Sequence, residues 1–241
     1  MKNLIVDIGN SRIKSAVFED DKIVFEHVFQ NLETLLERVG NLGFDHCIVS
    51  SVKYSDEELK KALGFPFVYL TAKTPVPIEN RYATPDTLGV DRKAAVIGAR
   101  ALFPSGSMLS IDLGTCITYD FLNNKDEYLG GAISPGMNMR FKSMHEQTAR
   151  LPLVEISDNK EINLVGDRTI NGLQSGVYHG ILFEMEGFIR AYRHQHQDLK
   201  VIICGGDSKF FETLTKDYIF VIPNLVLYGL NRILTYNVNK K

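Results

Sequence analysis

Two stretches decide the fold: LIVDIGNS at residues 4–11 and LSIDLGT at residues 109–115. In each, an apolar run leads into Asp-x-Gly, and a Ser or Thr hydroxyl follows. The pattern predicts a tight β-hairpin whose glycine permits a sharp bend or the close approach of a ligand. Backbone N–H groups in such a turn bind phosphate, and the aspartate binds a cation directly or through water. One copy alone would be weak evidence, because Asp-x-Gly also occurs in ordinary hairpin turns. Two copies roughly one domain apart indicate a duplicated fold that holds a nucleotide.

The composition sets broad limits on the function. The 241 residues, 44% hydrophobic and 23% charged, suit a globular protein, with one large domain or two of roughly 100–120 residues. The net charge of −2 gives no electrostatic case for binding nucleic acid or an anionic membrane. We expect neither a signal peptide nor a membrane span. Cys47, Cys116 and Cys204 lie in apolar surroundings, which indicates reduced cysteines and a cytoplasmic protein.

Hydrophobic periodicity predicts a similar order of elements twice. The first half reads as strands 3–8, 12–18 and 22–28, helix 32–39, strand 47–49, helix 55–63 and strand 67–70. The second half reads as strands 107–113, 115–122 and 127–133, helices 137–147 and 169–195, strand 200–204, helix 208–214, strand 218–222 and helix 224–237. This order predicts an α/β protein with two mixed sheets covered by helices, divided into domains 1–106 and 107–241. The irregular, proline-containing stretch 71–92 is expected to be a functional loop.

Several further segments carry a family resemblance. They are Tyr82-Ala-Thr-Pro85, Gly89-Val90-Asp91-Arg92, the GGAISPG stretch at 130–136, TARLP at 148–152, GDRT at 166–169 and QSG at 174–176. With the two Asp-x-Gly segments, they resemble the type III pantothenate kinases from residue 4 to about residue 206. The resemblance implies the duplicated actin-like (ribonuclease H-like) ATPase fold of sugar kinases, acetate kinase and heat-shock chaperone ATPases. It also implies pantothenate and ATP as substrates, Mg²⁺, a monovalent cation (K⁺ or NH₄⁺) and a homodimer.

The two hairpins are the expected nucleotide site. The first supplies Asp7, which holds Mg²⁺ through water, and further ATP-binding residues: Ile8, Gly9, Asn10, Ser11, Arg12, Ile13 and Lys14. A phosphoryl-transfer transition state spreads charge over its oxygens, so backbone donors and a metal-organising carboxylate are the useful groups. The resemblance assigns Thr115 to ATP and Asp112 to the monovalent cation, an ion suited to hard oxygen ligands. The alternative for each hairpin is a plain structural turn.

The segment Gly89-Val90-Asp91-Arg92 is the expected substrate site. Asp91 is the candidate general base, because the proton of a primary alcohol must leave as the O–P bond forms. At a helix start, such an aspartate is also typical of an N-terminal cap with an ion pair. Arg92 offers paired donors to the substrate carboxylate or the moving phosphoryl group, or it forms a surface ion pair.

Two other residues are assigned to the substrate by the resemblance. Tyr82 is similar to the substrate-contacting tyrosine of the family, or it is a packed loop aromatic. Thr169 bonds the pantothenate amide, caps the helix that follows, or does both. Gly205-Gly206-Asp207 resembles the adenosine-side loop, or it is a simple strand-to-helix turn.

His194 and His196 are two residues apart and do not share a helix face, so we do not expect a metal site there. The sequence has no Gly-x-x-x-x-Gly-Lys-[Ser/Thr] motif, which excludes a P-loop kinase. Helix 169–195 carries apolar residues on more than one face, which favours a second contact, either a two-fold dimer or a second domain.

The sequence therefore predicts a pantothenate kinase that makes 4′-phosphopantothenate in the first step towards coenzyme A. One alternative is a kinase of the same fold that acts on another small alcohol or sugar. The other is a non-catalytic nucleotide-binding regulator, against which the retention of Asp7, Asp91, Arg92 and Asp112 argues.

Overall fold

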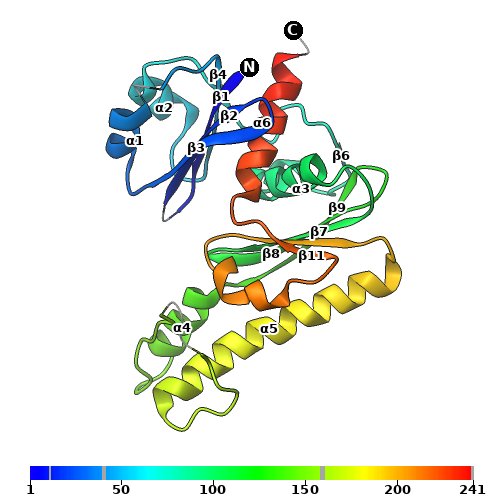
Figure 1. Cartoon of the computed structure of the whole chain (residues 1–241). Helices are drawn as coiled ribbons and strands as arrows, with labels where there is room; N and C mark the ends of the chain where they lie inside the picture. The colour runs from blue at the N-terminus through cyan, green and yellow to red at the C-terminus, as the bar shows by residue number, and fades with distance from the viewer. Residues whose placement is uncertain (11, 40–41, 158–160, 240–241) are drawn as a thin grey trace. The chain divides into compact units, whose positions relative to one another are not determined.

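The computed structural model describes residues 1–10, 12–39, 42–157 and 161–239, which form two compact units (Figure 1). The first unit contains Met1–Ser105, Lys125–Leu129 and Asn224–Lys241; the second contains Gly106–Asn124 and Gly130–Pro223. One boundary falls next to the expected division at residue 106. The chain then crosses back twice, so the units do not follow a single cut.

The first unit is built on a five-stranded sheet with the order β3-β2-β1-β4-β5. Its strands are β1 (Lys2–Ile8), β2 (Ile13–Glu19), β3 (Lys22–Phe29), β4 (His46–Ser51) and β5 (Val68–Tyr69). β1 is antiparallel to β2 and parallel to β4. Alternate residues of β1, beginning with Leu4, pack in one core with α1 (Leu32–Val39) and α2 (Asp56–Leu63). A capping box between Ser55 and Glu58 starts α2, and the left-handed Gly64 ends it.

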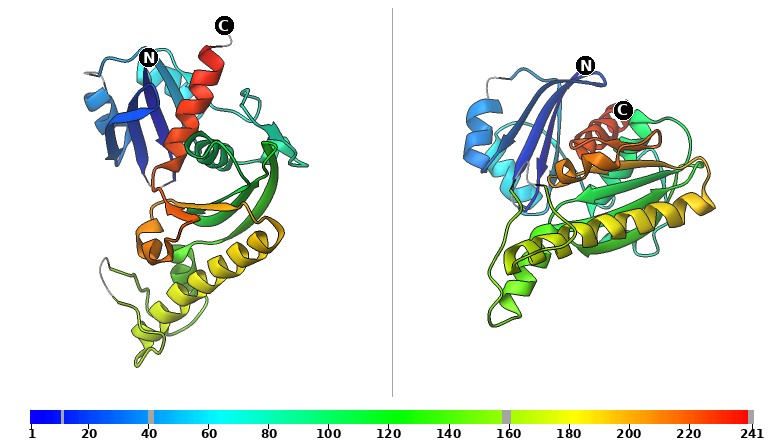
Figure 2. Two further views of the ribbon diagram at one scale, coloured as in Figure 1. Left: turned by 45° about the vertical axis from the view of Figure 1, so that its right-hand side comes forward. Right: turned by 60° about the horizontal axis from the view of Figure 1, so that its bottom comes forward.

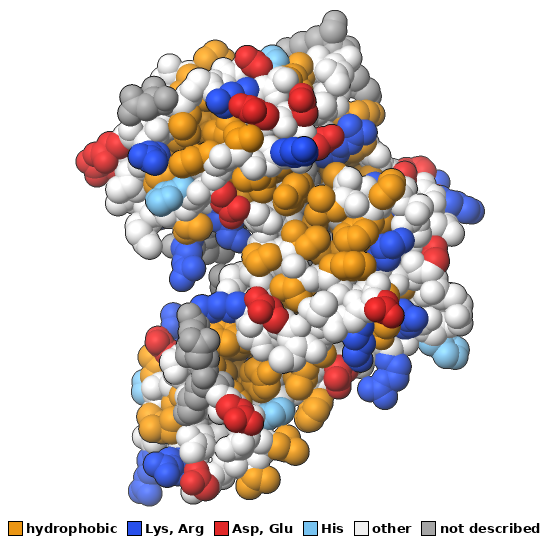
Figure 3. All heavy atoms as spheres, viewed as in Figure 1, with side chains coloured by type: hydrophobic (Ala, Val, Ile, Leu, Met, Phe, Trp, Pro, Cys, Tyr) orange, Lys and Arg blue, Asp and Glu red, His pale blue; other side chains and the backbone are white. Residues whose placement is uncertain are grey.

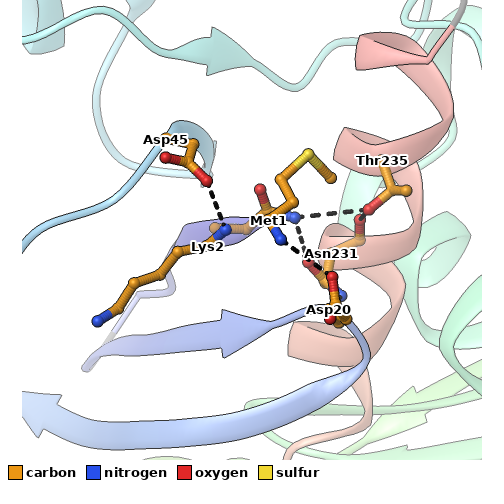
Figure 4. A network of polar contacts seen from close by, with 7 residues as sticks. Met1, Lys2, Asp20, Asp45, Asn231 and Thr235 are labelled. Carbon is orange, nitrogen blue, oxygen red and sulfur yellow. Dashed lines mark hydrogen bonds and ion pairs between the residues drawn. The ribbon is translucent and has the colours of Figure 1, made fainter.

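Two further helices complete this unit, α3 (Val90–Leu102) and α6 (Leu225–Val238). They cross at glycines: a Cβ on Gly229 would lie 1.8 Å from the Ala94 carbonyl oxygen, so no larger residue fits. The Asn3 side chain of β1 donates a 2.8 Å hydrogen bond to Asn231 of α6. Asn231 in turn donates to the Asp20 carbonyl, and the Met1 amino group lies 3.0 Å from the Asp20 carboxylate (Figure 4). The buried bond between Asn3 and Asn231 and the partly buried bond from Asn231 to Asp20 join the C-terminal helix to the N-terminal sheet.

The second sheet has six strands in the order β11-β10-β7-β8-β9-β6, and most of these strands belong to the second unit. Its strands are β6 (Glu79–Asn80), β7 (Met108–Leu113), β8 (Cys116–Leu122), β9 (Glu127–Pro135), β10 (Lys200–Cys204) and β11 (Ile219–Val221). The 27-residue helix α5 (Thr169–Gln195) runs along one face of the sheet, and α4 (Met137–Glu146) packs against α5 (Figure 2). Val177, Ile181, Met185 and Ile189 of α5 share a core with Leu109 and other β7 residues.

The two sheets repeat one topology. The order β3-β2-β1-β4-β5 of the first sheet corresponds to β9-β8-β7-β10-β11 of the second, with the same hairpin and the same parallel neighbour at its centre. The Asp-x-Gly segments lie at equivalent hairpins, β1–β2 and β7–β8. The duplication expected from the two sequence segments is therefore present in the fold.

The structure differs from the expected elements in two places. The stretch 71–92 is not wholly irregular, because it contains β6 and the short 3-10 helix η1 (Pro85–Thr87). Residues Ser208–Leu214 form a 3-10 segment, η2, with non-helical backbone angles at Phe211 instead of an α-helix. Among the described residues, no helix combines the length and apolar character needed to cross a membrane.

Candidate functional site

Asp7 lies near the end of β1, opposite Lys14 of β2 and Ser50 of β4. Side chains alternate along a strand, so Asp7 shares a sheet face with Asn3 and not with Leu4. Asn3 contacts α6, which packs with α3. The alternation of β1 thus directs Asp7 to the face of the sheet on which the helices α3 and α6 pack.

The pKa of Asp7 is raised to about 6, chiefly because the carboxylate is buried; Lys14 lowers the pKa, the negative charge of Asp91 raises it, and the hydrogen bond from the Ser50 hydroxyl lowers it. This effect means that Asp91 lies close enough for its charge to act on Asp7. The two residues are 84 positions apart in the sequence and belong to one unit. Perturbed carboxylates of this kind are typical of functional sites.

Asp91 is the second residue of α3. Its Oδ1 accepts a 2.8 Å hydrogen bond from the backbone N–H of Arg92. A Cβ on Gly89 would lie 2.5 Å from the same oxygen. The glycine therefore leaves room for the carboxylate to fold over the helix start, where the helix dipole favours a negative charge.

Arg92 is buried, with only 7% of its surface exposed, which excludes the surface ion pair considered as an alternative. Its guanidinium lies 5.8 Å from the ring centroid of Tyr82, a cation–π contact. The Tyr82 ring lies 6.1 Å from that of Tyr128. Tyr82 is therefore half-buried and packs between Tyr128 and Arg92, so it lies beside the arginine of the expected substrate site.

Lys93 was not anticipated from the sequence. It is 2% exposed, its Nζ donates to the Ala72 carbonyl at 2.9 Å, and burial lowers its pKa. The lysine ties the loop after β5 to the first turn of α3. A lysine in a helix is ordinarily a surface residue, so there was little reason in the sequence to expect a buried one. The only signal was the position of Lys93 between Arg92 and the apolar run that follows it.

The remaining residues of the first hairpin have mixed environments. Asn10 and Arg12 are exposed, whereas the side chains of Ile8 and Ile13 belong to the core. Any contact of these two isoleucines with ATP therefore involves backbone atoms. The Gly9 N–H donates to the Arg12 carbonyl at 3.1 Å and closes the turn. Ser11 lies outside the described residues.

The second hairpin is enclosed by two other loops of its own unit. Asp112 of β7 lies opposite Thr118 of β8 and Cys204 of β10. Gly205 has φ +93°, and a Cβ there would lie 2.4 Å from Asp112 Oδ1. Gly205 is thus required both by its backbone angle and by the aspartate beside it. The Asp207 N–H donates to the Leu113 carbonyl, which joins the 205–207 loop to the hairpin.

The GGAISPG segment approaches the hairpin from another side. The Gly136 N–H donates to the Thr115 carbonyl at 3.1 Å. A Cβ on Gly136 would lie 2.3 Å from the Gly114 carbonyl oxygen. Thr115 itself is exposed. The structure therefore brings together three segments that the sequence analysis treated separately: 112–115, 134–136 and 205–207.

Thr169 is the exposed first residue of α5, and the cap position is occupied by Arg168, so Thr169 is not the N-cap. A cavity of about 240 Å³ lies beside this helix start and is lined by Asp167, Asn171 and Gln174, among others. A larger cavity of about 500 Å³ lies where the end of α5 meets the start of β11. Asp112 lies at the other end of the same sheet, so this larger cavity is not the candidate site.

Comparison with known proteins decides the family. The model of the type III pantothenate kinase family matches residues 3–191. This chain belongs to the type III pantothenate kinase family. It is 42% identical to the type III pantothenate kinase of Cytophaga hutchinsonii, with 98% of this chain and 100% of that protein covered. It is 43% identical to that of Bacteroides fragilis, with 98% of each covered.

Solved structures agree with the fold of this type III pantothenate kinase family member. A Campylobacter jejuni protein described as a Baf family transcriptional activator aligns with a TM-score of 0.64 at 24% identity, over 98% of this chain and 99% of that one. A ROK hexokinase from Thermus thermophilus aligns with a TM-score of 0.52 at 13% identity, over 99% and 100% of the two chains. At these identities the likeness concerns the fold alone, and it confirms the expected duplicated actin-like fold.

Proposed function

We propose that the residues described above carry out the transfer of the ATP γ-phosphoryl group to the primary hydroxyl of pantothenate. The activity itself, that of an ATP-dependent pantothenate kinase in coenzyme A biosynthesis, follows from membership of the family. The observation that best supports the residue assignment is the position of Asp91, whose carboxylate is oriented by the Arg92 N–H at the start of α3 and whose charge acts on Asp7 at the end of β1.

In the proposed reaction Asp91 accepts the proton of the pantothenate hydroxyl, whose oxygen attacks the γ-phosphorus as ADP leaves. A carboxylate held at a helix start by a backbone N–H, with Gly89 leaving it room, suits a general base that must keep one orientation. Arg92 and Tyr82 bind the substrate, with Gly89 and Val90 forming the backbone beside it. The fork of a guanidinium suits the pantothenate carboxylate.

Both Asp-x-Gly hairpins are ATP-binding segments in this proposal. The first supplies Asp7 and residues 8–14, and the second supplies Thr115. Asp7 is an oxygen donor at a hairpin end, which fits Mg²⁺ held through water; when bound, the ion neutralises charge on the phosphate oxygens. Asp112 is the proposed ligand of the monovalent cation, because its carboxylate lies at the meeting point of two loops and provides a hard oxygen.

We also propose a homodimer formed through the α4–α5 side of the second unit. Most apolar residues of α5 pack within the second unit, so fewer of them are left for a second contact than the sequence suggested. The apolar residues of α5 that remain exposed include Phe183 (55%) and Ile170 (47%). Figure 3 shows hydrophobic side chains at the surface over this part of the molecule. Such patches mark interaction sites, and closed two-fold dimers are the commonest assembly.

Thr169, at the exposed start of α5, is the proposed contact to the pantothenate amide.

The alternatives differ in what they require of the acceptor and of the base. A kinase for another small alcohol keeps Asp91 but does not need Arg92 for a carboxylate. A regulator without catalysis needs neither. The buried Arg92 beside Tyr82 and the oriented Asp91 favour the pantothenate kinase.

A coupled assay with ATP, Mg²⁺, K⁺ and a panel of alcohols tests the proposal. Pantothenate should be the preferred acceptor, and Asp91→Asn should lower kcat by about 10²–10⁴-fold, the usual contribution of a general base. Nucleotide binding by Asp91→Asn, followed by calorimetry, should stay close to that of the unchanged protein. If the variant retained more than a third of kcat, Asp91 would not be the base.

A further inference from the structure

A polar network in the second unit connects α5 to the wall of the second hairpin. Glu184 of α5 accepts hydrogen bonds from Tyr119 of β8 at 2.8 Å and from Ser134 of β9 at 2.6 Å. Its other oxygen forms a 2.5 Å ion pair with Arg140 of α4. The side chains of Arg140 and Glu184 are only 22% and 23% exposed. Four elements thus meet at one carboxylate.

Arg140 also holds the end of β9, just before α4. Its Nε donates to the Pro135 carbonyl at 2.8 Å, and its Nη2 to the Ser134 hydroxyl at 3.2 Å. The planar guanidinium therefore holds the Ser134–Pro135 segment and Glu184 at the same time, a geometry that a lysine cannot reproduce.

The segment held by Arg140 is the one that touches the hairpin. Gly136 follows Pro135, donates to the Thr115 carbonyl, and leaves no space for a Cβ next to Gly114. A continuous series of contacts therefore leads from Glu184 through Arg140, Pro135 and Gly136 to the 112–115 hairpin. The packing of α5 on the sheet is provided by apolar residues such as Ile181 and Met185. The carboxylate of Glu184 is therefore not needed for that packing.

We propose that Arg140 and Glu184 are a positioning pair that sets the backbone of the ATP hairpin around Thr115. The inference rests on the assignment of that hairpin to ATP. The pair acts through Pro135 and Gly136, which in turn hold Gly114 and Thr115. Groups that orient a binding residue from behind commonly change affinity or activity by about 10–100-fold when removed.

The test compares Arg140→Gln, Arg140→Lys and Glu184→Gln with Arg100→Gln. Arg100 of α3 forms a similar, partly buried pair with Asp126 and donates to the Phe103 carbonyl, both in the first unit. We expect Arg140→Gln to lower kcat/KM for ATP by about 10–100-fold, mainly through KM, while KM for pantothenate stays within about twofold. Arg140→Lys should recover only part of the loss, and Arg100→Gln should leave KM for ATP unchanged.

Thermal melting of each variant separates positioning from stability. If Arg140→Gln and Arg100→Gln lose ATP affinity in proportion to their melting temperatures, or if Arg140→Gln affects pantothenate more than ATP, the positioning role is wrong. Combining Arg140→Gln with Glu184→Gln should weaken ATP affinity no more than either change alone, because each change already breaks the same ion pair. An additive loss would overturn the pairing. Thr115→Ala distinguishes the two levels of the proposal. If that change leaves ATP binding intact, the hairpin assignment fails; if it weakens binding and Arg140→Gln does not, only the inference fails.

Discussion

Replacing Asp7 by asparagine should remove activity and stabilise the fold at neutral pH. The pKa of Asp7 is raised from 3.8 to about 6 by burial and by Asp91. A carboxyl whose pKa is higher in the folded state binds its proton more tightly there, so the fold loses stability as the pH rises from about 4 to about 6. The difference corresponds to about 3 kcal/mol above pH 6, at about 1.4 kcal/mol for each tenfold change in proton affinity.

Urea unfolding of the two proteins at pH 4, 5, 6 and 7.5 measures this directly. Asparagine has no proton to lose, so Asp7→Asn should gain about 3 kcal/mol relative to the unchanged protein between pH 4 and pH 7.5. Asp21→Asn, on the exposed β2–β3 turn, controls for the loss of one negative charge. A stability difference for Asp7→Asn that is constant with pH, or that shrinks as the pH rises, would refute the assignment of a raised pKa and the closeness of Asp7 to Asp91.

Three further predictions follow from the same residues. Activity should be low in Na⁺ buffer and rise strongly with K⁺ or NH₄⁺, and Asp112→Ala should abolish that response in the coupled assay, since a methyl group cannot replace an anionic ligand; full activity without K⁺ or NH₄⁺ would exclude the cation site. Gly205→Ala should lower the melting temperature and weaken the K⁺ response together, because φ +93° strains alanine and its Cβ would meet Asp112; an alanine variant that melts and responds normally would contradict that contact. Light scattering should give a mass of about twice 27.1 kDa. Mixing Asp91→Asn with a Thr169 variant deficient in pantothenate binding should restore partial activity if the partner's Thr169 completes the site. A dimer without restored activity would support the assembly and exclude the shared site.

The sequence by itself determined the local elements and the repeated hairpin. The alternation in β1 and β7, the capping box of α2 and the Asp-x-Gly turns are all set by residues within a few positions of one another, so they can be identified without a fold. The GGAISPG and Gly-Val-Asp-Arg segments were also visible, and the family resemblance they carried was correct. The environments of these residues could not be identified from the sequence, because a motif states which residues are present and not what surrounds them.

Only the tertiary structure decided which distant residues meet. The buried state of Arg92 and Lys93, the effect of Asp91 on Asp7, and the packing of α6 with the N-terminal unit depend on contacts between residues tens to hundreds of positions apart. The same holds for the Arg140–Glu184 pair, whose partners come from two helices and two strands. Periodicity records which face of an element is apolar, whereas the element that covers that face is chosen by close packing of the whole chain, with steric gaps such as those at Gly136 and Gly205 as the deciding constraint.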